Sequence, residues 1–191
     1  MIAATGRADT IWACLLAGAA SWVVIYLLLP KPMWVYVFGH ELTHAVWTWC
    51  FGGRVKKFKA TSKGGHVIVT KSNFLITLAP YFFPIYAVLL FLLFLIGSLI
   101  WPITPYAFWF HLLLGAAYAF HLTFTVHVLS MEQSDVTENG ILFSAVTIFL
   151  GNLLVLILGL PLITRGMGLL TALSWWAEEV SLALRRLGQL I

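Results

Sequence analysis

Five apolar runs, each close to the length that crosses a lipid bilayer, constrain the fold of this chain more than any other feature. A helix needs roughly 20 apolar residues to span the hydrocarbon core of a membrane. Hydrophobic residues make up 61% of the 191 residues and charged residues only 9%, which is too little charge to cover a soluble domain. The sequence therefore predicts an all-α polytopic membrane protein with about five transmembrane helices. The runs are Ile11 to Leu29, Met33 to Phe51, Asn73 to Ile100, Ala107 to Leu129 and Ile141 to Leu160.

Two segments depart from the apolar pattern. Residues 53–72 alternate loosely between polar and β-branched residues around Lys63-Gly64-Gly65, which predicts a small β-hairpin at the membrane surface. From Gly168 onward, polar residues recur every three or four positions, which predicts an amphipathic helix lying in the membrane interface. We therefore expect one transmembrane domain over residues 1–166 and a C-terminal amphipathic helix over residues 167–191.

Two local signals predict how the transmembrane helices begin and meet. Pro80 and Pro84 lie near the start of the third run, so that run should be kinked or begin irregularly. The first run contains four consecutive small residues around Gly18, which would let a neighbouring helix approach closely.

Basic residues gather in the predicted hairpin. Six of the eleven Lys and Arg residues lie between Arg54 and Lys71, which in a membrane protein predicts a cytoplasmic loop rather than a nucleic-acid site. If every run crosses the membrane once, the N-terminus and the 130–140 loop lie on the same side as the hairpin. We expect a multi-pass protein of a prokaryotic cytoplasmic membrane, with the lipid bilayer as a partner and no nucleic acid. The sequence indicates no oligomeric state.

The second run contains the motif His40-Glu41-Leu42-Thr43-His44. An α-helix turns about 100° per residue, so His40 and His44 share one face and can bind the same zinc ion. Glu41 lies beside them and can take a proton from a water molecule on that zinc. Ionisable groups inside apolar helices are functional by default, which favours one catalytic zinc over a structural histidine pair bonded to neighbouring helices.

A catalytic zinc site needs a third protein ligand and one open position. Three acidic residues lie together in the loop after the fourth run, namely Glu132, Asp135 and Glu138, and we select Asp135. The histidines of the fourth run point to different faces of their helix, although His121 or His127 could still contact metal or substrate.

These residues resemble the site-2 protease family of intramembrane zinc metalloproteases. The resemblance covers about residues 34–155, and its most specific part is the HExxH motif. No PDZ or nucleotide-sensing module is expected, so the chain is similar to a minimal member of that family. The matching pieces are Phe38-Gly39-His40-Glu41-Leu42-Thr43-His44-Ala45, Gly52-Gly53-Arg54-Val55, Gly64-Gly65-His66-Val67 and Leu78-Ala79-Pro80.

The resemblance implies a role for each site residue. His40 and His44 would be zinc ligands, Glu41 the catalytic base, and an aspartate after the last core helix, here Asp135, the third ligand. The family's proline-rich loop leading into Asp-Gly is missing, and Gly140 follows Asp135 by five residues instead of one.

The resulting hypothesis is an intramembrane zinc metalloprotease that cleaves peptide bonds in or near transmembrane segments. Its expected partner is a membrane-protein or peptide substrate, and its active site should open to the cytoplasm, on the side of the hairpin. The substrate helix must unwind before cleavage, and the hairpin edge could then pair with it. Asn139, Asn152 and His66 are candidate substrate contacts, with helix packing as the alternative role of Asn152. Two other functions stay open. One is a membrane zinc hydrolase acting on lipid or lipidated peptide, and the other is a non-catalytic binding or chaperone-like protein.

Overall fold

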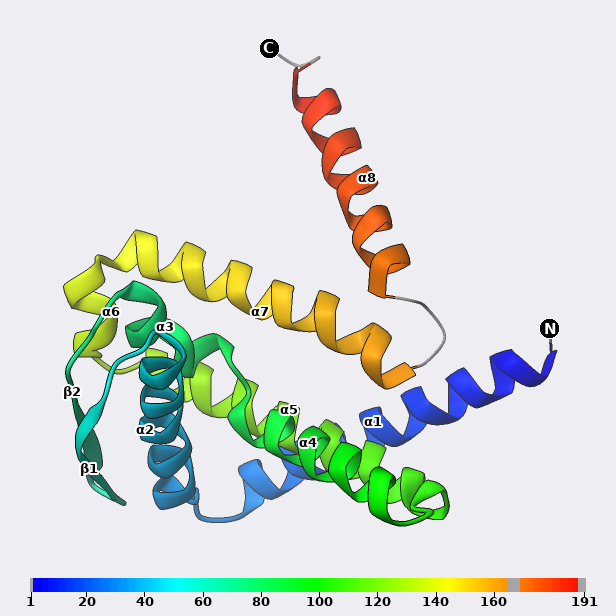
Figure 1. The fold of residues 1–191 in the computed structure, drawn as a ribbon, viewed down its shortest axis with the longest axis horizontal. Coiled ribbons are helices and arrows are strands. Elements are labelled where there is room, and N and C mark those ends of the chain that lie inside the picture. Colours follow the sequence, from blue (N-terminus) through cyan, green and yellow to red (C-terminus); the bar gives the residue numbers. More distant parts are fainter. Residues whose placement is uncertain (1, 165–168, 189–191) are drawn as a thin grey trace.

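The computed structural model describes residues 2–164 and 169–188, and nearly all of them lie in helices (Figure 1). A single two-stranded sheet interrupts the helices in this part of the chain. The predicted domain boundary at residue 166 falls outside the described residues. The elements are α1 (Ile2–Leu28), α2 (Met33–Cys50), β1 (Val55–Thr61), β2 (Gly64–Val69), α3 (Phe74–Phe82), α4 (Ile85–Ile100), the short 3₁₀ helix η1 (Thr104–Tyr106), α5 (Ala107–Leu129), α6 (Ser134–Asn139), α7 (Ile141–Thr164) and α8 (Leu169–Gly188).

The described residues contain three helices that are long and apolar enough to cross a membrane. They are Asp9–Leu28 within α1, Ala107–Leu129 (α5) and Ile141–Ile163 within α7, and the bent pair α3–α4 makes a fourth crossing if it counts as one span. The predicted helical membrane fold with a small hairpin is therefore confirmed, with fewer crossings than the expected five or so. Helix α2 is not among the candidates, because its two histidines and its glutamate make its 18 residues too polar.

The break between α3 and α4 has the cause that the sequence predicts. Pro84 has no N–H to continue the helical hydrogen bonds, and its ring disfavours helical geometry at the preceding residue. Phe83 is accordingly extended, with φ −100° and ψ 105°, and the two helices meet at a bend of 77°. The bend places α3 against α2 and leaves α4 to run along the bundle beside α5 (Figure 1).

The hairpin is confirmed at the predicted place. β1 and β2 pair antiparallel through a two-residue turn, because Thr61 is the partner of Gly64. Gly64 has φ +135°, a conformation that favours glycine. One face of the hairpin covers α2, where the rings of Phe38 and Phe58 lie 5.7 Å apart.

Helices α1 and α5 run parallel and touch backbone to backbone. A Cβ atom on Gly18 would lie 1.8 Å from the carbonyl oxygen of Leu112, and one on Gly115 would lie 2.0 Å from that of Leu15. Further along both helices, the Trp22 Nε1–H donates to Thr123 Oγ1 at 2.9 Å. The small residues around Gly18 therefore allow the close approach that the sequence predicts.

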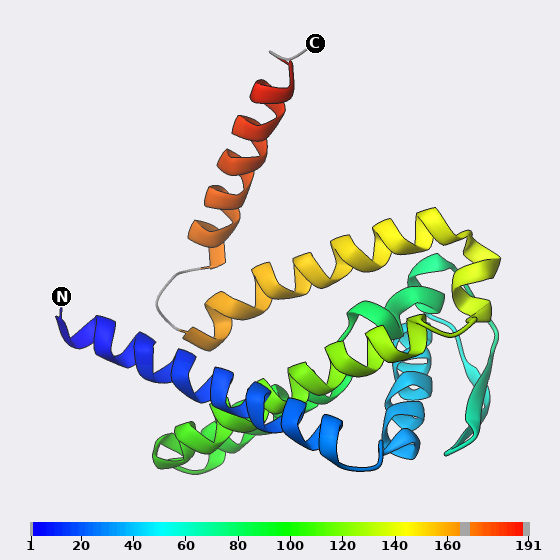
Figure 2. The same cartoon turned by 180° about the vertical axis from the view of Figure 1, so that it is seen from behind.

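This parallel pairing places the two ends of α1 relative to the membrane. Two adjacent spans that run parallel begin on the same face, so the start of α1 lies on the side of the 101–105 turn. Helix α2, the hairpin and α6 gather at the other end of the bundle, with α2 lying across the direction of α5 and α7 (Figures 1 and 2). The expectation that the N-terminus shares a side with the hairpin is therefore wrong, because α2 does not add the crossing that it required.

Labelling of introduced cysteines tests this arrangement. In a background without Cys14 and Cys50, a membrane-impermeant maleimide should modify Asp9→Cys and Ile103→Cys from one side of sealed vesicles. It should modify Ser62→Cys, in the hairpin turn, from the other side. Reaction of Asp9→Cys and Ser62→Cys from the same side would contradict the arrangement.

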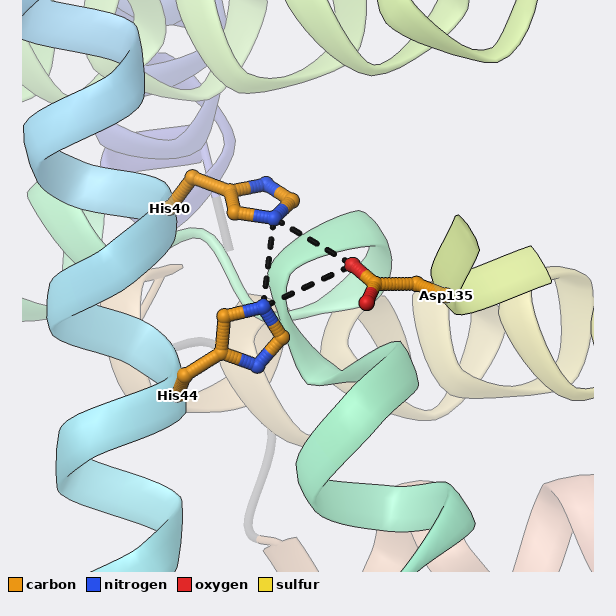
Figure 3. A group of neighbouring side chains, drawn as sticks. All are labelled: His40, His44 and Asp135. Carbon is orange, nitrogen blue, oxygen red and sulfur yellow. Dashed lines mark hydrogen bonds and ion pairs between the residues drawn. The ribbon is translucent and has the colours of Figure 1, made fainter. Parts of the chain in front are cut away.

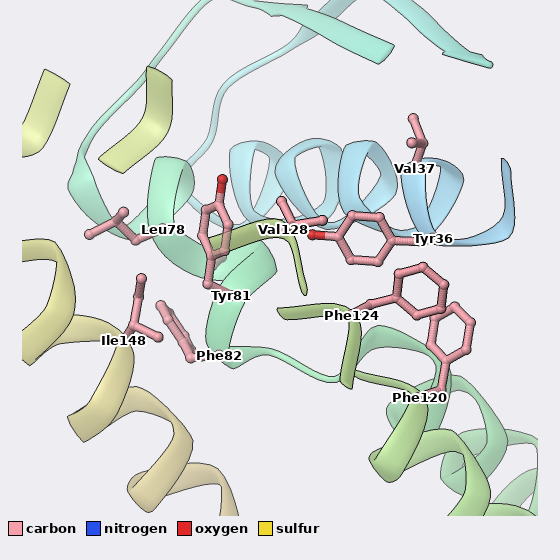
Figure 4. Packing of buried hydrophobic residues seen from close by; sticks show 10 residues of the cluster. Tyr36, Val37, Leu78, Tyr81, Phe82, Phe120, Phe124, Val128 and Ile148 are labelled. Carbon is pink, nitrogen blue, oxygen red and sulfur yellow. The ribbon is translucent and has the colours of Figure 1, made fainter. Parts of the chain in front are cut away.

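The main buried cluster lies directly below the motif helix (Figure 4). Four helices contribute to it, and the ring of Tyr36 on α2 stacks on Phe124 of α5 with centroids 5.0 Å apart. Leu78, Tyr81 and Phe124 are fully buried. The motif helix therefore packs on the main buried cluster, which restricts the movement of its side chains.

Candidate metal centre

His40 and His44 project from the same face of α2, one helical turn apart. Their Nε2 atoms lie 3.2 Å from each other, although their rings are nearly perpendicular. The Nδ1 atom of His44 lies 2.9 Å from the carbonyl oxygen of Ile76, so it carries the proton and leaves the Nε2 lone pair free. Two such nitrogens facing each other form a site for a cation.

Asp135 completes a triangle of donor atoms (Figure 3). It lies in the first turn of α6, which joins the end of α5 to the start of α7. Its Oδ2 atom lies 3.4 Å from His40 Nε2 and 3.5 Å from His44 Nε2. Among the described residues, these three form the one group of His, Cys, Asp and Glu side chains that could hold a metal ion.

The size of this triangle fits zinc. Zinc lies about 2.0–2.2 Å from nitrogen and oxygen ligands, and tetrahedral angles then separate the ligand atoms by about 3.3–3.5 Å. The three observed separations are 3.2, 3.4 and 3.5 Å. The donor set of two imidazoles and one carboxylate is also one that catalytic zinc sites use.

The environment of Asp135 keeps its side chain ionised. Burial by itself would raise the pKa of this carboxyl, but hydrogen bonding and attraction from His40 and His44 outweigh burial and hold the pKa well below its usual range. The side chain is therefore a carboxylate at neutral pH, which is the form that binds a metal.

A cavity of about 620 Å³ opens beside the triangle. All three donor residues line it, together with Glu41, the β2 residues from Gly64 to Val67, and Glu138 at the end of α6. It is large enough for several residues of an extended peptide. Glu41 is the buried carboxyl group of the motif, and it faces this space beside the imidazoles.

The hairpin contacts Glu41 through Gly65. A Cβ atom on Gly65 would lie 2.7 Å from Glu41 Cγ and 2.8 Å from its Oε1, as well as 2.7 Å from the carbonyl oxygen of Lys59. Only a residue without a side chain can lie here, so this glycine allows β2 to cover the carboxyl group closely.

Replacement of Gly65 by alanine should therefore displace Glu41 without touching a donor atom. We expect activity to fall by about 10²-fold, which is the usual effect of misplacing a catalytic group by about 1 Å, while metal binding is retained. Gly97→Ala is the matched control, because its new methyl group would meet Ile103 at an ordinary 3.5 Å. Full activity of Gly65→Ala would show that the hairpin does not set the position of Glu41.

The other predicted site residues lie nearby, but two of the three form hydrogen bonds to the backbone of the helices around the site. The Asn139 side chain donates to the carbonyl oxygen of Asp135 at 2.8 Å. Asn152 donates to the carbonyl oxygens of Tyr81 and Ile148, so it joins α7 to α3. Of the three predicted substrate contacts, His66 is the one that lines the cavity.

The remaining acids and the α5 histidines are not part of the donor triangle. His121 is buried against a small second cavity of about 20 Å³ that His40 also lines, and its Nε2 has no hydrogen-bond partner among the residues that the structure describes. His127 packs against Tyr26, with ring centroids 6.4 Å apart. Glu138 is exposed at the rim of the main cavity.

Two tyrosines that sequence reasoning missed also contact the donor residues. The Tyr36 hydroxyl lies 3.2 Å from His40 Nδ1, and the Tyr81 hydroxyl donates to Asp135 Oδ2 at 3.1 Å. Tyr36 precedes His40 by four residues, and that helical spacing is a signal that could have found it. No comparable spacing connects Tyr81 to the motif.

A family model described as Peptidase M50B-like matches residues 11–131, which is well over half of the chain. The match includes α2 with its motif, the hairpin and α3 to α5, and it ends four residues before Asp135. Searches of curated proteins and of solved structures returned no match.

Proposed function

Because the chain belongs to the Peptidase M50B-like family, within the site-2 proteases, we propose that it is an intramembrane zinc metalloprotease. In this proposal it hydrolyses peptide bonds in or near transmembrane segments of other membrane proteins. The family is one of membrane metalloproteases, and the apolar helices point to an integral membrane protein. The observation that carries the proposal is the donor triangle of His40, His44 and Asp135, whose dimensions fit one zinc ion with an open fourth position.

In this mechanism the chain's own residues have separate tasks. His40, His44 and Asp135 would hold the metal. Zinc bound there would supply Lewis acidity, which would polarise a carbonyl oxygen and lower the pKa of an attacking water to about 7. Glu41 accepts the proton of the attacking water and donates it to the amine of the departing product. A carboxyl group beside the donors favours an enzyme, because a structural metal site needs no proton acceptor.

The hairpin supports the handling of substrate. A transmembrane helix keeps its carbonyl groups in internal hydrogen bonds, so it must unwind before cleavage. The sheet has two strands, so each strand keeps one edge available for a further strand. Residues Gly64 to Val67 line the cavity, and an extended substrate segment paired along the hairpin would pass beside Glu41.

We also propose that the cavity opens toward the cytoplasm. Seven of the eleven Lys and Arg residues are Lys31, between α1 and α2, and the six from Arg54 to Lys71. All seven lie at the end of the bundle that carries the site. Excess basic charge marks the cytoplasmic face of a membrane protein.

Product analysis with the purified protein tests the proposed activity. The zinc-loaded protein in lipid vesicles is incubated with transmembrane peptides, and the products are identified by mass spectrometry. We expect cleaved peptide bonds, loss of cleavage on chelation and recovery with added zinc. Modified lipid with intact peptides would favour a lipid hydrolase, and a zinc-loaded protein that changes neither would favour a binding protein. Either result would contradict the proposal.

A further inference from the structure

Each of the three donor residues also forms a hydrogen bond with a second group. For His44 that group is the Ile76 carbonyl oxygen, which accepts from Nδ1. For His40 and Asp135 the second group is the hydroxyl of a buried tyrosine. Figure 4 shows both tyrosines in the main buried cluster, with the phenol of Tyr36 pointing from α2 toward the ring of Tyr81.

We propose that Tyr36 and Tyr81 are positioning residues, which orient His40 and Asp135 so that their donor atoms converge on one metal ion. The inference rests on the proposed function, since it assigns these hydroxyls a task at the same metal site. It concerns the affinity and geometry of metal binding.

Tyr36 determines which ring nitrogen of His40 carries the proton. Metal binding through Nε2 requires a lone pair there, so Nδ1 must carry the proton and needs an acceptor. The Tyr36 oxygen, 3.2 Å away, can accept that proton's hydrogen bond. The Tyr36 oxygen therefore accepts a hydrogen bond from Nδ1 of His40, as the Ile76 carbonyl oxygen does from Nδ1 of His44. The ring of Tyr36 cannot swing away, because it is buried and stacked on Phe124 at an angle of 11°.

Tyr81 fixes the carboxylate of Asp135. The terminal torsion of an aspartate is broad and permits rotation of the two oxygens. The Tyr81 hydroxyl donates to Oδ2, which is the oxygen that faces both imidazoles. Tyr81 is fully buried and does not line the main cavity, so it acts through Asp135 and not on the substrate.

Two contacts hold Tyr81 itself, one to its backbone and one to its ring. Its backbone carbonyl accepts from the Asn152 side chain at 3.0 Å, which ties it to α7. The ring meets the edge of His40 at a centroid distance of 5.3 Å and an angle of 84°. The bend between α3 and α4 lies just beyond Tyr81, so this irregular segment brings a hydroxyl under a site whose donors come from α2 and α6.

The test compares zinc affinity in three phenylalanine variants, measured by competition with a chromophoric chelator. Partners behind metal ligands typically contribute about 10–100-fold to metal affinity, so Tyr36→Phe and Tyr81→Phe should bind zinc about 10–100-fold more weakly than the wild type. Tyr86→Phe is the matched control. Like Tyr36→Phe, this variant loses one tyrosine hydroxyl that forms a hydrogen bond with α2. The lost bond runs from the Tyr86 hydroxyl to the Val35 carbonyl oxygen and involves no donor residue.

Cobalt provides a second readout that a purely structural role would not change. At saturating cobalt, the visible absorption bands report ligand geometry. They should shift in Tyr36→Phe and Tyr81→Phe and keep the wild-type form in Tyr86→Phe.

The outcomes separate the inference from the proposed function. A wild-type protein that binds no zinc would overturn the proposed function itself. A wild type that binds one zinc, with unchanged affinity and cobalt spectra in Tyr36→Phe and Tyr81→Phe, would overturn only the positioning role. An equal loss of affinity in Tyr86→Phe would also overturn it, because the effect would then come from the placement of α2.

Discussion

Replacement of Glu41 by glutamine should lower peptidase activity by about 10²–10⁴-fold, the range that a general acid–base group contributes. The amide has nearly the shape of the carboxyl group, so the packing under Gly65 is preserved. It cannot accept the proton of the attacking water. Zinc should stay bound, because Glu41 is not one of the three donor residues.

The controls for this prediction are zinc content and a second carboxyl group in the same cavity. Glu138 also lines the cavity but lies at its exposed rim, so Glu138→Gln should keep most of the activity. The rate is followed by cleavage of a transmembrane peptide in vesicles. Wild-type turnover by a zinc-loaded Glu41→Gln protein would remove the proposed base from the mechanism.

Replacement of Asp135 by alanine should abolish activity by removing the metal. A direct ligand contributes more than a group behind it, so zinc affinity should fall by more than the roughly 100-fold upper limit for outer partners. The two imidazoles would remain as a pair with no charged ligand to complete the site. Zinc content after dialysis and chelator competition measure the loss.

Glu138→Ala is the matched control for Asp135→Ala, since it removes a carboxylate from the same short helix. It should leave zinc content unchanged, because Glu138 is not part of the donor triangle. Full zinc occupancy in Asp135→Ala would exclude Asp135 as a ligand and leave the motif without the third donor proposed here.

The helices and the hairpin could be predicted because apolar length and turn chemistry are local properties of the sequence. The role of α2 in the membrane topology could not be predicted. Its apolar run is about as long as a membrane span, but length alone does not show whether the helix crosses the membrane. The parallel contact of α1 and α5 decides that question. That contact depends on Gly18 meeting a helix nearly 100 residues away.

In the site, too, local features could be predicted and long-range contacts could not. Helical spacing was sufficient to pair His40 with His44 and to put Glu41 beside them. No local pattern decides among the three loop acids, because the choice depends on which one the first turn of α6 presents to α2. Tyr81 was beyond sequence reasoning, since a bend at Pro84 and a contact across 54 residues bring it to Asp135.

The way α2 lies across the bundle has a consequence for the fragments that the proposed cleavage would produce. Tyr36 stacks on Phe124, which lies five residues, or about 8 Å along the helix, before the end of α5. If the end of α5 marks the membrane face, the site would lie at about that depth. Water reaches such a depth without a long channel. A substrate span of roughly 20 residues cut there would leave an apolar stretch of about 15, shorter than the roughly 17 that anchor a helix stably. We therefore expect both fragments to leave the bilayer more readily than the intact segment, so that cleavage releases the substrate on both sides of the cut.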